Sequence, residues 1–272
     1  MESLGKLNIN SSDFEKIKCK KIGEGNDAIV YNAGKGNLYK VYKEESMFKN
    51  INKPTKIYKK ENRKKNIEER ILYLDKDGVK IYYKDAFKRI VKKQDSINLS
   101  SLPKSSLYIN GKFSGCVLKK INGVSIHNIF GILSKKTKLK ILKSILEEVK
   151  ELTDNFIYPI DIANSPWVGK HSNILINFKL KPELIDLDGN STLYRECYDE
   201  TCYNYTIASL NLLFLELIND TTFAYYDNSI DKEFLKNKLM KNGINEELAI
   251  KLSNYSADYF ELLDYASLSL RK

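Results

Sequence analysis

Two glycines and a lysine near the N-terminus form the first group of residues whose spacing suits a chemical role. Gly23-Glu24-Gly25 begins the pattern G-x-G-x-x-A-x-V, which runs to Val30 between two expected strands. Glycines are needed where backbone N–H groups approach phosphate oxygens closely, because a side chain would block that approach. Lys40 follows Val30 in an alternating strand and is placed to reach the same phosphates. This group predicts a phosphate-binding loop, and an ordinary hairpin loop is the alternative.

A second group lies in the middle of the chain. Asn173 stands before the apolar run 174–176, and Asp186 ends the run 183–186. If the two runs pair as a hairpin, Asn173 and Asp186 lie side by side. An amide oxygen and a carboxylate are hard ligands of the kind Mg²⁺ takes, usually completed by substrate phosphates and water. The segment therefore predicts a metal site, and a structural hairpin capped by these two residues is the alternative.

The order of these motifs resembles the protein-kinase-like superfamily, which includes eukaryotic-type protein kinases and the aminoglycoside and choline phosphotransferases. The shared order is glycine loop, strand lysine, helix glutamate, Asn-Ile-Leu and Asp-x-Asp, over roughly residues 18–220. The resemblance implies ATP and Mg²⁺ as cofactors. It implies that Gly23 and Gly25 cover the nucleotide, that Lys40 holds phosphates, and that Asn173 and Asp186 hold the metal.

The segment 117–123 resembles the strand and hinge that border the adenine in this superfamily. The resemblance implies that Leu118 is the gatekeeper residue and that Lys119 to Ile121 face the adenine. A lysine among the phosphates also needs a carboxylate to hold it, and an amphipathic helix expected at 61–74 supplies candidates. We choose Glu68, because apolar residues follow it on the packing side, and Glu69 stays a competitor.

The catalytic base is expected in Tyr158-Pro159-Ile160-Asp161, which falls where the superfamily has His-Arg-Asp or His-Gly-Asp. The resemblance implies that Asp161 accepts or orients the proton of the acceptor hydroxyl. Members usually place this aspartate about five residues before the metal-binding asparagine, whereas Asp161 and Asn173 lie twelve apart. Asp188 stands where a glycine is usual, and either supports the metal or bonds the following turn. No Ala-Pro-Glu motif follows, so no peptide-docking activation segment is evident.

The pattern of the remaining chain predicts an α+β protein of two lobes. Short alternating runs between turns predict strands near 20–22, 29–32, 38–43, 79–83, 89–92, 106–109 and 115–120. The tight turn Gly34–Asn37 is expected to join the second and third of these strands as a hairpin. Apolar residues at helical spacing predict helices at 138–152, 230–240 and 246–265, with Asn245 as an N-cap. The segment 206–218 is apolar on most sides and predicts a buried helix. We expect a β-rich N-lobe with one main helix at 1–121 and a mostly helical C-lobe at 122–272, as in the bilobal protein-kinase-like fold.

Composition limits the partners. The chain has 272 residues and a formal net charge of +10, which favours an acidic partner such as phosphate. The basic stretch 49–65 has one aromatic residue and no nucleic-acid-module signature, so we do not expect nucleic acid as the partner. The N-terminus lacks the features of a secretory signal, and no apolar run approaches the roughly 20 residues of a bilayer span. We therefore expect a cytoplasmic protein without a membrane partner.

These observations lead to a hypothesis with two rivals. The first is an ATP- and Mg-dependent kinase that moves the γ-phosphoryl group to a hydroxyl acceptor, either a protein Ser/Thr or a small molecule. The second is a pseudokinase that binds nucleotide without turnover, which the long Asp161–Asn173 spacing motivates. The third is transfer of the nucleotidyl (AMP) group by the same residues.

Overall fold

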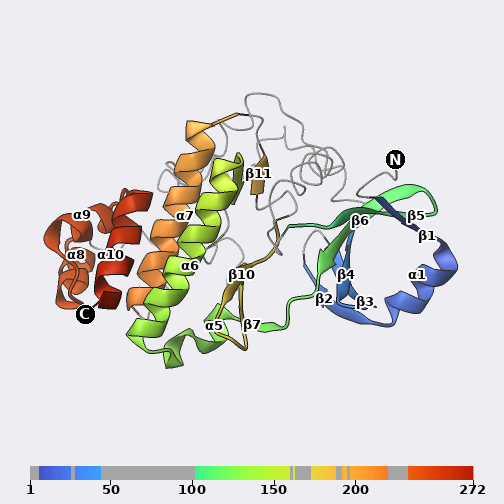
Figure 1. Ribbon diagram of the computed structural model, residues 1–272, viewed down its shortest axis with the longest axis horizontal. Coiled ribbons are helices and arrows are strands. Elements are labelled where there is room, and N and C mark those ends of the chain that lie inside the picture. Colours follow the sequence, from blue (N-terminus) through green and yellow to red (C-terminus); the bar gives the residue numbers. More distant parts are fainter. Residues whose placement is uncertain are drawn as a thin grey trace, which may run out of the picture. The chain divides into compact units, whose positions relative to one another are not determined.

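The computed structural model describes residues 6–25, 28–43, 102–159, 162, 173–187, 192–194, 197–219 and 232–271 (Figure 1). The chain divides into two compact units. Unit 1 comprises residues 1–121 and 186–190, and unit 2 comprises residues 122–185 and 191–272. Most described strands belong to unit 1 and most described helices to unit 2, so the protein is α+β.

Unit 1 contains a mixed six-stranded sheet. In spatial order its strands are β1 (Lys6–Ile9), β5 (Ser105–Ile109), β6 (Lys112–Lys119), β4 (Asn37–Tyr42), β3 (Ala28–Gly34) and β2 (Lys21–Glu24). The β1–β5 pair is parallel, and the other neighbouring pairs are antiparallel. Gly34 and Gly36 both have positive φ in the β3–β4 turn, where glycine is the favoured residue. The hairpin predicted at this turn is confirmed.

One side of this sheet is apolar and carries Lys40. Residues directly opposite each other on neighbouring strands point to the same side, and Val30, Lys40 and Cys116 are such partners on β3, β4 and β6. The same side holds an apolar cluster, formed by Ala28, Tyr42 and Cys116 with Phe113 and Leu118 packed against them. The strand register therefore directs a lysine toward the apolar side of the sheet.

The helix α1 (Ser11–Lys18) covers the other side. The ring of Phe14 in this helix packs edge to face against the ring of Tyr31 of β3, with the ring centroids 5.5 Å apart. The side chain of Asn10 caps the helix by accepting the N–H of Asp13 at 2.8 Å. The sequence did not reveal α1, because Phe14 is its one buried residue and a single apolar residue makes no helical stripe.

Gly115 of β6 allows β6 to pass close to Lys40. It lies opposite Val41 of β4, with φ at 156°. A Cβ atom built on Gly115 would lie 1.9 Å from the carbonyl oxygen of Lys40. No side chain fits at that distance, so the close pairing of β4 and β6 beside Lys40 requires glycine at this position.

Unit 2 is built around two long helices, α6 (Lys135–Asp154) and α7 (Glu200–Asn219), which pack against each other. The predicted stripe of α6 is buried along its whole length, at Leu139, Leu142, Ile145, Leu146, Val149 and Leu152. The helix α7 is buried around most of its circumference between Thr206 and Leu217, as predicted from its apolar sequence. In the described residues, no helix combines the length and the hydropathy that crossing a membrane requires.

Short strands complete unit 2. β7 (Gly123–Ser125), β9 (Ile174–Asn177) and β10 (Pro182–Leu184) form one small sheet with β9 in the centre. β8 (Ile157–Pro159) and β11 (Thr192–Tyr194) form an antiparallel pair. The short helices α5 (Ile126–Ile129) and η2 (Phe130–Ile132) follow β7. The antiparallel pairing of β9 with β10 confirms the hairpin predicted between Asn173 and Asp186.

The C-terminal part of unit 2 contains α8 (Lys232–Lys241), α9 (Glu246–Ser253) and α10 (Tyr259–Arg271). Asn245 caps α9 by accepting the N–H of Leu248 at 2.8 Å, which confirms its predicted role. The single helix predicted at 246–265 is wrong. Tyr255 has a positive φ of 56°, and the amide and carbonyl groups of Ala257 bond to Asn211 of α7 instead of continuing a helix.

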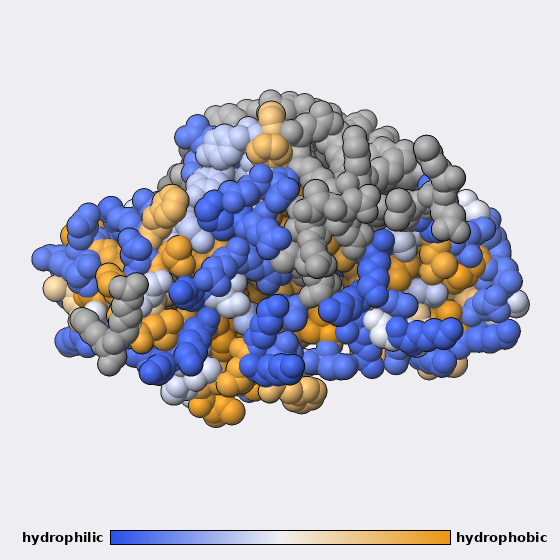
Figure 2. Space-filling model, in the orientation of Figure 1, coloured by the Kyte–Doolittle hydropathy of each residue, from blue (hydrophilic) through white to orange (hydrophobic). Residues whose placement is uncertain are grey.

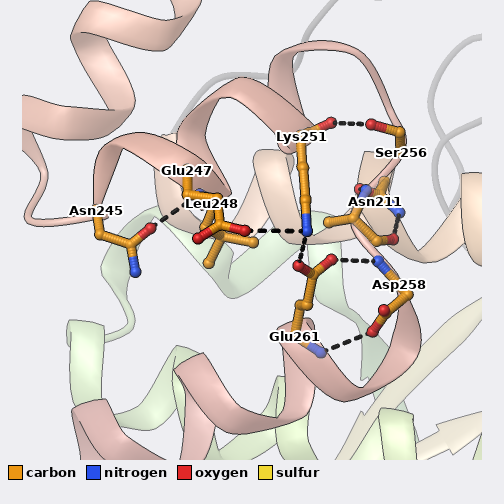
Figure 3. A network of polar contacts seen from close by, with 9 residues as sticks. Asn211, Asn245, Glu247, Leu248, Lys251, Ser256, Asp258 and Glu261 are labelled. Carbon is orange, nitrogen blue, oxygen red and sulfur yellow. Dashed lines mark hydrogen bonds and ion pairs between the residues drawn. The ribbon is translucent and has the colours of Figure 1, made fainter.

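Polar contacts stabilise this break (Figure 3). Asp258 and Glu261 form a capping box, in which each side chain accepts the other's backbone N–H at 2.9 Å. Lys251 of α9 bonds to Glu261 and lies 3.3 Å from a carboxylate oxygen of Glu247. A new helix therefore begins at Tyr259, because this capping box satisfies the N–H of Glu261 in its first turn and the N–H of Asp258 just before it.

Several predicted elements lie outside the described residues. These are the helix at 61–74 with Glu68 and Glu69, and the strands at 79–83 and 89–92. The strands predicted near 20–22, 29–32, 38–43, 106–109 and 115–120 correspond to β2, β3, β4, β5 and β6.

Gly115→Ala tests the close approach of β4 and β6. We expect the variant to lose at least about 2 kcal/mol of unfolding free energy, because the new methyl group meets the Lys40 carbonyl. Gly23→Ala is the matched control, since its Cβ would have no heavy atom within 4 Å. Urea unfolding followed by circular dichroism measures both, and equal midpoints for the two variants would contradict the packing described.

Candidate nucleotide-binding site

The glycine loop joins β2 to β3. Gly23 is paired with Val30, and the N–H of Gly25 donates to the carbonyl of Ala28 at 2.9 Å. A Cβ on Gly23 would meet nothing within 4 Å, and one on Gly25 would meet only the Ala28 oxygen, at 3.9 Å. The space at both glycines is open, and the loop keeps a hairpin shape at its base.

Glu24, between the two glycines, is paired with two lysines. Its carboxylate contacts the ammonium groups of Lys21 and, at 2.7 Å, Lys43. The hydrogen bond from Lys21 is the largest of the effects that lower the pKa of Glu24 to about 2. The glutamate therefore stays ionised at neutral pH, and its charge is neutralised by Lys21 of β2 and by Lys43, which follows β4. A carboxylate so paired does not leave net negative charge beside the glycines.

Lys40 contacts Asp186. The Lys40 side chain is 15% exposed, and its Nζ donates a hydrogen bond to Oδ1 of Asp186. Both residues belong to unit 1, although they lie 146 positions apart in the sequence. Asp186 has a positive φ of 64°, a conformation that aspartate tolerates better than most residues. The structure thus joins the predicted phosphate lysine to the predicted metal aspartate.

Asn173 and Asp186 flank the β9–β10 hairpin. The carbonyl of Asn173 accepts the N–H of Ile185 at 2.8 Å, which extends the hairpin by one bond beyond the Ile174–Leu184 pair. Asp186 is the next residue along the chain. Asn173 belongs to unit 2, and Asp186 is grouped with unit 1.

Each of the two predicted metal residues carries an oxygen donor of the kind that a hard divalent cation takes. The Asp186 side chain is 35% exposed and presents carboxylate oxygen, while Asn173 is half-buried and offers an amide oxygen. The described residues contain no group of three or more His, Cys, Asp or Glu side chains suited to a metal ion. Mg²⁺ commonly completes ligands of this kind with phosphate and water.

The predicted hinge residues lie at the end of β6 and just after it. Leu118 packs against the apolar cluster on the Lys40 side of the sheet, and it lies opposite Leu38 of β4. Lys119 is exposed and pairs with Asn37. Ile121 is half-buried and is the last residue of unit 1 before the chain enters unit 2. Leu118 therefore lies on the same side of the sheet as Lys40 and Val30.

Asp161 lies outside the described residues, and the described residues nearest to it are Pro159 and Ile162. Before it, Tyr158 of β8 is fully buried, and its hydroxyl oxygen accepts the N–H of Asp199 at 3.0 Å. Burial raises the pKa of Tyr158. After it, the N–H of Ile162 donates to Oγ of Ser209 in α7 at 3.0 Å. A buried helix thus holds the backbone one residue beyond the expected base.

Ser209 and Glu24 are residues that sequence reasoning did not assign. Ser209 bonds a backbone group 47 positions away, and a single sequence gives no sign of such a pairing. Glu24 had a local signal, because Lys21 precedes it by three residues. Glu68, Asp161 and Asp188 all lie outside the described residues, so their predicted roles stay predictions.

No protein-family model matches the chain, and no curated protein matches it.

The acid titration of Glu24 gives one prediction. In the wild-type protein its carboxyl should titrate near pH 2, and Lys43→Ala should raise the pKa toward the ordinary value of 4.5. Because the folded-state pKa is the lower one, these contacts stabilise the fold above pH 4.5 and lose that effect as the pH falls toward 2. NMR titration of the Glu24 side chain measures the pKa. Lys16→Ala is the control, and a wild-type value near 4.5 would refute the pairing.

The contact between Ser209 and Ile162 gives another prediction. Ser209→Ala should cost about 1–2 kcal/mol of unfolding free energy, because the buried N–H of Ile162 loses its acceptor. Ser253→Ala is the matched control: Ser253 is also buried, but its hydroxyl bonds the Ile250 carbonyl of its own helix. Hydrogen exchange at Ile162 should accelerate in Ser209→Ala alone. Unchanged exchange there would show that Ser209 does not hold this segment.

Proposed function

We propose that the protein is an ATP- and Mg-dependent phosphotransferase of the protein-kinase-like type, moving the γ-phosphoryl group to a hydroxyl acceptor. The observation that carries this proposal is the hydrogen-bonded ion pair between Lys40 and Asp186. The glycine loop with its strand lysine and the Asn-Ile-Leu…Asp motif lie in separate parts of the sequence. Lys40 of the first group and Asp186 of the second are in contact.

The chemistry of phosphoryl transfer needs cations around the phosphates and a means of orienting the acceptor. Lys40 provides a partly buried ammonium group whose position is fixed by β3 and β6 on either side. Asp186 and Asn173 provide oxygen ligands, and Mg²⁺ when bound would neutralise phosphate charge. In the absence of nucleotide, Lys40 and Asp186 neutralise each other, and each also suits a component of ATP-Mg.

The sheet of unit 1 supports the proposed two-lobed arrangement. Its order β5-β6-β4-β3-β2 sets the glycine loop, the lysine strand and the strand that leads to the hinge on adjacent strands. Leu118 and Val30 are half-buried on the Lys40 side of the sheet, and they are apolar side chains of the kind that an adenine ring packs against. In this proposal unit 1 is the nucleotide-binding lobe and unit 2 is the catalytic lobe.

The remaining roles follow the resemblance. Asp161 would accept or orient the acceptor's proton, and Glu68 would hold Lys40 when nucleotide is bound. The bond from Ile162 to Ser209 supports the assignment of Asp161, because a catalytic side chain needs a fixed backbone beside it. The acceptor is a protein Ser/Thr or a small molecule.

Radiolabelled ATP tests the proposal. The purified chain with Mg²⁺ should transfer or hydrolyse the γ-phosphate of ATP, and Lys40→Ala and Asp186→Ala should each lower the rate by at least about 100-fold. Lys6→Ala, which alters an exposed lysine on β1 of the same sheet, is the control and should retain the wild-type rate.

Three outcomes separate the alternatives. Equal rates in all four proteins would refute the phosphotransferase. Thermal stabilisation by ATP-Mg without turnover would instead indicate a pseudokinase. Transfer of label from α-labelled ATP, with none from γ-labelled ATP, would indicate nucleotidyl transfer by the same residues.

A further inference from the structure

The turn between β9 and β10 has a rigid, side-chain-supported shape. The Asn177 carboxamide oxygen accepts the N–H groups of Lys179 and Lys181, at 2.9 and 3.1 Å. The backbone closes the same loop, because the N–H of Asn177 donates to the carbonyl of Lys181 at 3.0 Å. We call residues 177–181 the tip. Its conformation is set by its own hydrogen bonds, so its side chains are presented in fixed positions.

The tip exposes apolar side chains. Phe178 is 89% exposed and Leu180 is 50% exposed, and the lysines on either side of Leu180 are exposed as well. Apolar side chains reach the surface at the lower edge of Figure 2, below the segments that Figure 1 labels α5, β7 and β10. Neither Phe178 nor Leu180 is among the buried residues that form the core. Apolar residues gathered at the surface indicate an interaction site.

Leu180 is also conformationally unfavourable where it stands. Its φ is 59°, in the left-handed region that glycine adopts readily and a bulky side chain does not. The hydrogen bonds of the tip need this backbone conformation, but they do not need a leucine to supply it. Half of the surface of Leu180 faces solvent, so packing explains the choice of leucine only in part. A local conformational cost with a limited packing return points to a functional role for the Leu180 side chain.

We propose that the tip binds an anionic lipid surface, with Phe178 and Leu180 entering the interfacial layer. The order Phe-Lys-Leu-Lys alternates apolar and cationic groups over residues 178–181. At a bilayer surface the apolar side chains enter the acyl boundary, while lysines on long stems reach the headgroup phosphates. The formal net charge of +10 adds long-range attraction to such a surface.

A lipid surface fits the tip better than a protein partner does. A protein interface needs a broad complementary area, whereas these residues form the narrow end of a two-stranded hairpin. The proposal departs from our expectation from the sequence that no membrane is involved, which rested on the lack of a spanning segment. It is independent of the phosphotransferase activity.

Vesicle sedimentation tests the proposal on the full chain. The wild-type protein should co-sediment with phosphatidylcholine vesicles containing about 30% phosphatidylserine and not with pure phosphatidylcholine, and added salt should weaken the binding. Phe178→Ser and Leu180→Gly should each reduce binding at least about fivefold. Phe234→Ser is the matched control, because Phe234 is 65% exposed on α8, away from the tip in sequence, and it should bind as the wild type does.

Leu180→Gly separates binding from folding. Glycine is favoured at a φ of 59°, so the thermal midpoint should stay the same or rise while vesicle binding falls. A wild-type protein that stays in the supernatant with anionic vesicles would overturn the proposal. That result is the one expected if the tip binds a protein and not a lipid surface. Equal binding to neutral vesicles, or unchanged binding in both tip variants, would overturn it as well.

Discussion

The described structure of unit 1 depends on how the charge and the hydrogen-bond donors of a lysine on the apolar side of a sheet find a partner. Lys40 lies among aliphatic and aromatic side chains with 15% of its own side chain exposed. An ammonium group in such surroundings is costly unless a charged partner accepts its hydrogen bonds. Asp186, from the far half of the sequence, is such a partner. Gly115 lets β6 lie close against the strand that carries the lysine, and the β9–β10 hairpin ends two residues before the aspartate.

Buried side chains of unit 2 hold backbone segments that cannot join a helix or a sheet. Two of these side chains belong to the central helix α7: Ser209 bonds the backbone of Ile162, and Asn211 bonds the backbone of Ala257. The third is Tyr158, whose hydroxyl oxygen accepts the N–H of Asp199. Buried backbone groups must find partners, so these contacts allow irregular chain to pack against an apolar helix. One such segment borders the expected catalytic aspartate, which links the packing of α7 to the proposed chemistry.

Sequence patterns predicted the elements whose residues repeat regularly. The α6 stripe, the Gly34–Asn37 hairpin and the hairpin before Asp186 each have a local signal and were found. The helix α1 was missed because Phe14 alone is buried on it, and the break near Tyr255 was missed because the apolar spacing continues across it. The contact of Lys40 with Asp186 followed from the resemblance between motifs, since no periodicity reports on residues so far apart. The bond between Ser209 and Ile162 was not predicted, because neither a periodic pattern nor the resemblance indicates it.

The central claim is that Lys40 and Asp186 lie where the phosphates of ATP bind. Covalent labelling with 5′-fluorosulfonylbenzoyl adenosine tests it directly, because this reagent carries an adenosine and sulfonylates a lysine held close to it. Mass spectrometry of the digested protein should locate the label on Lys40, and excess ATP-Mg should suppress it. Labelling that spares Lys40, or that ATP-Mg does not diminish, would contradict a nucleotide site at this ion pair.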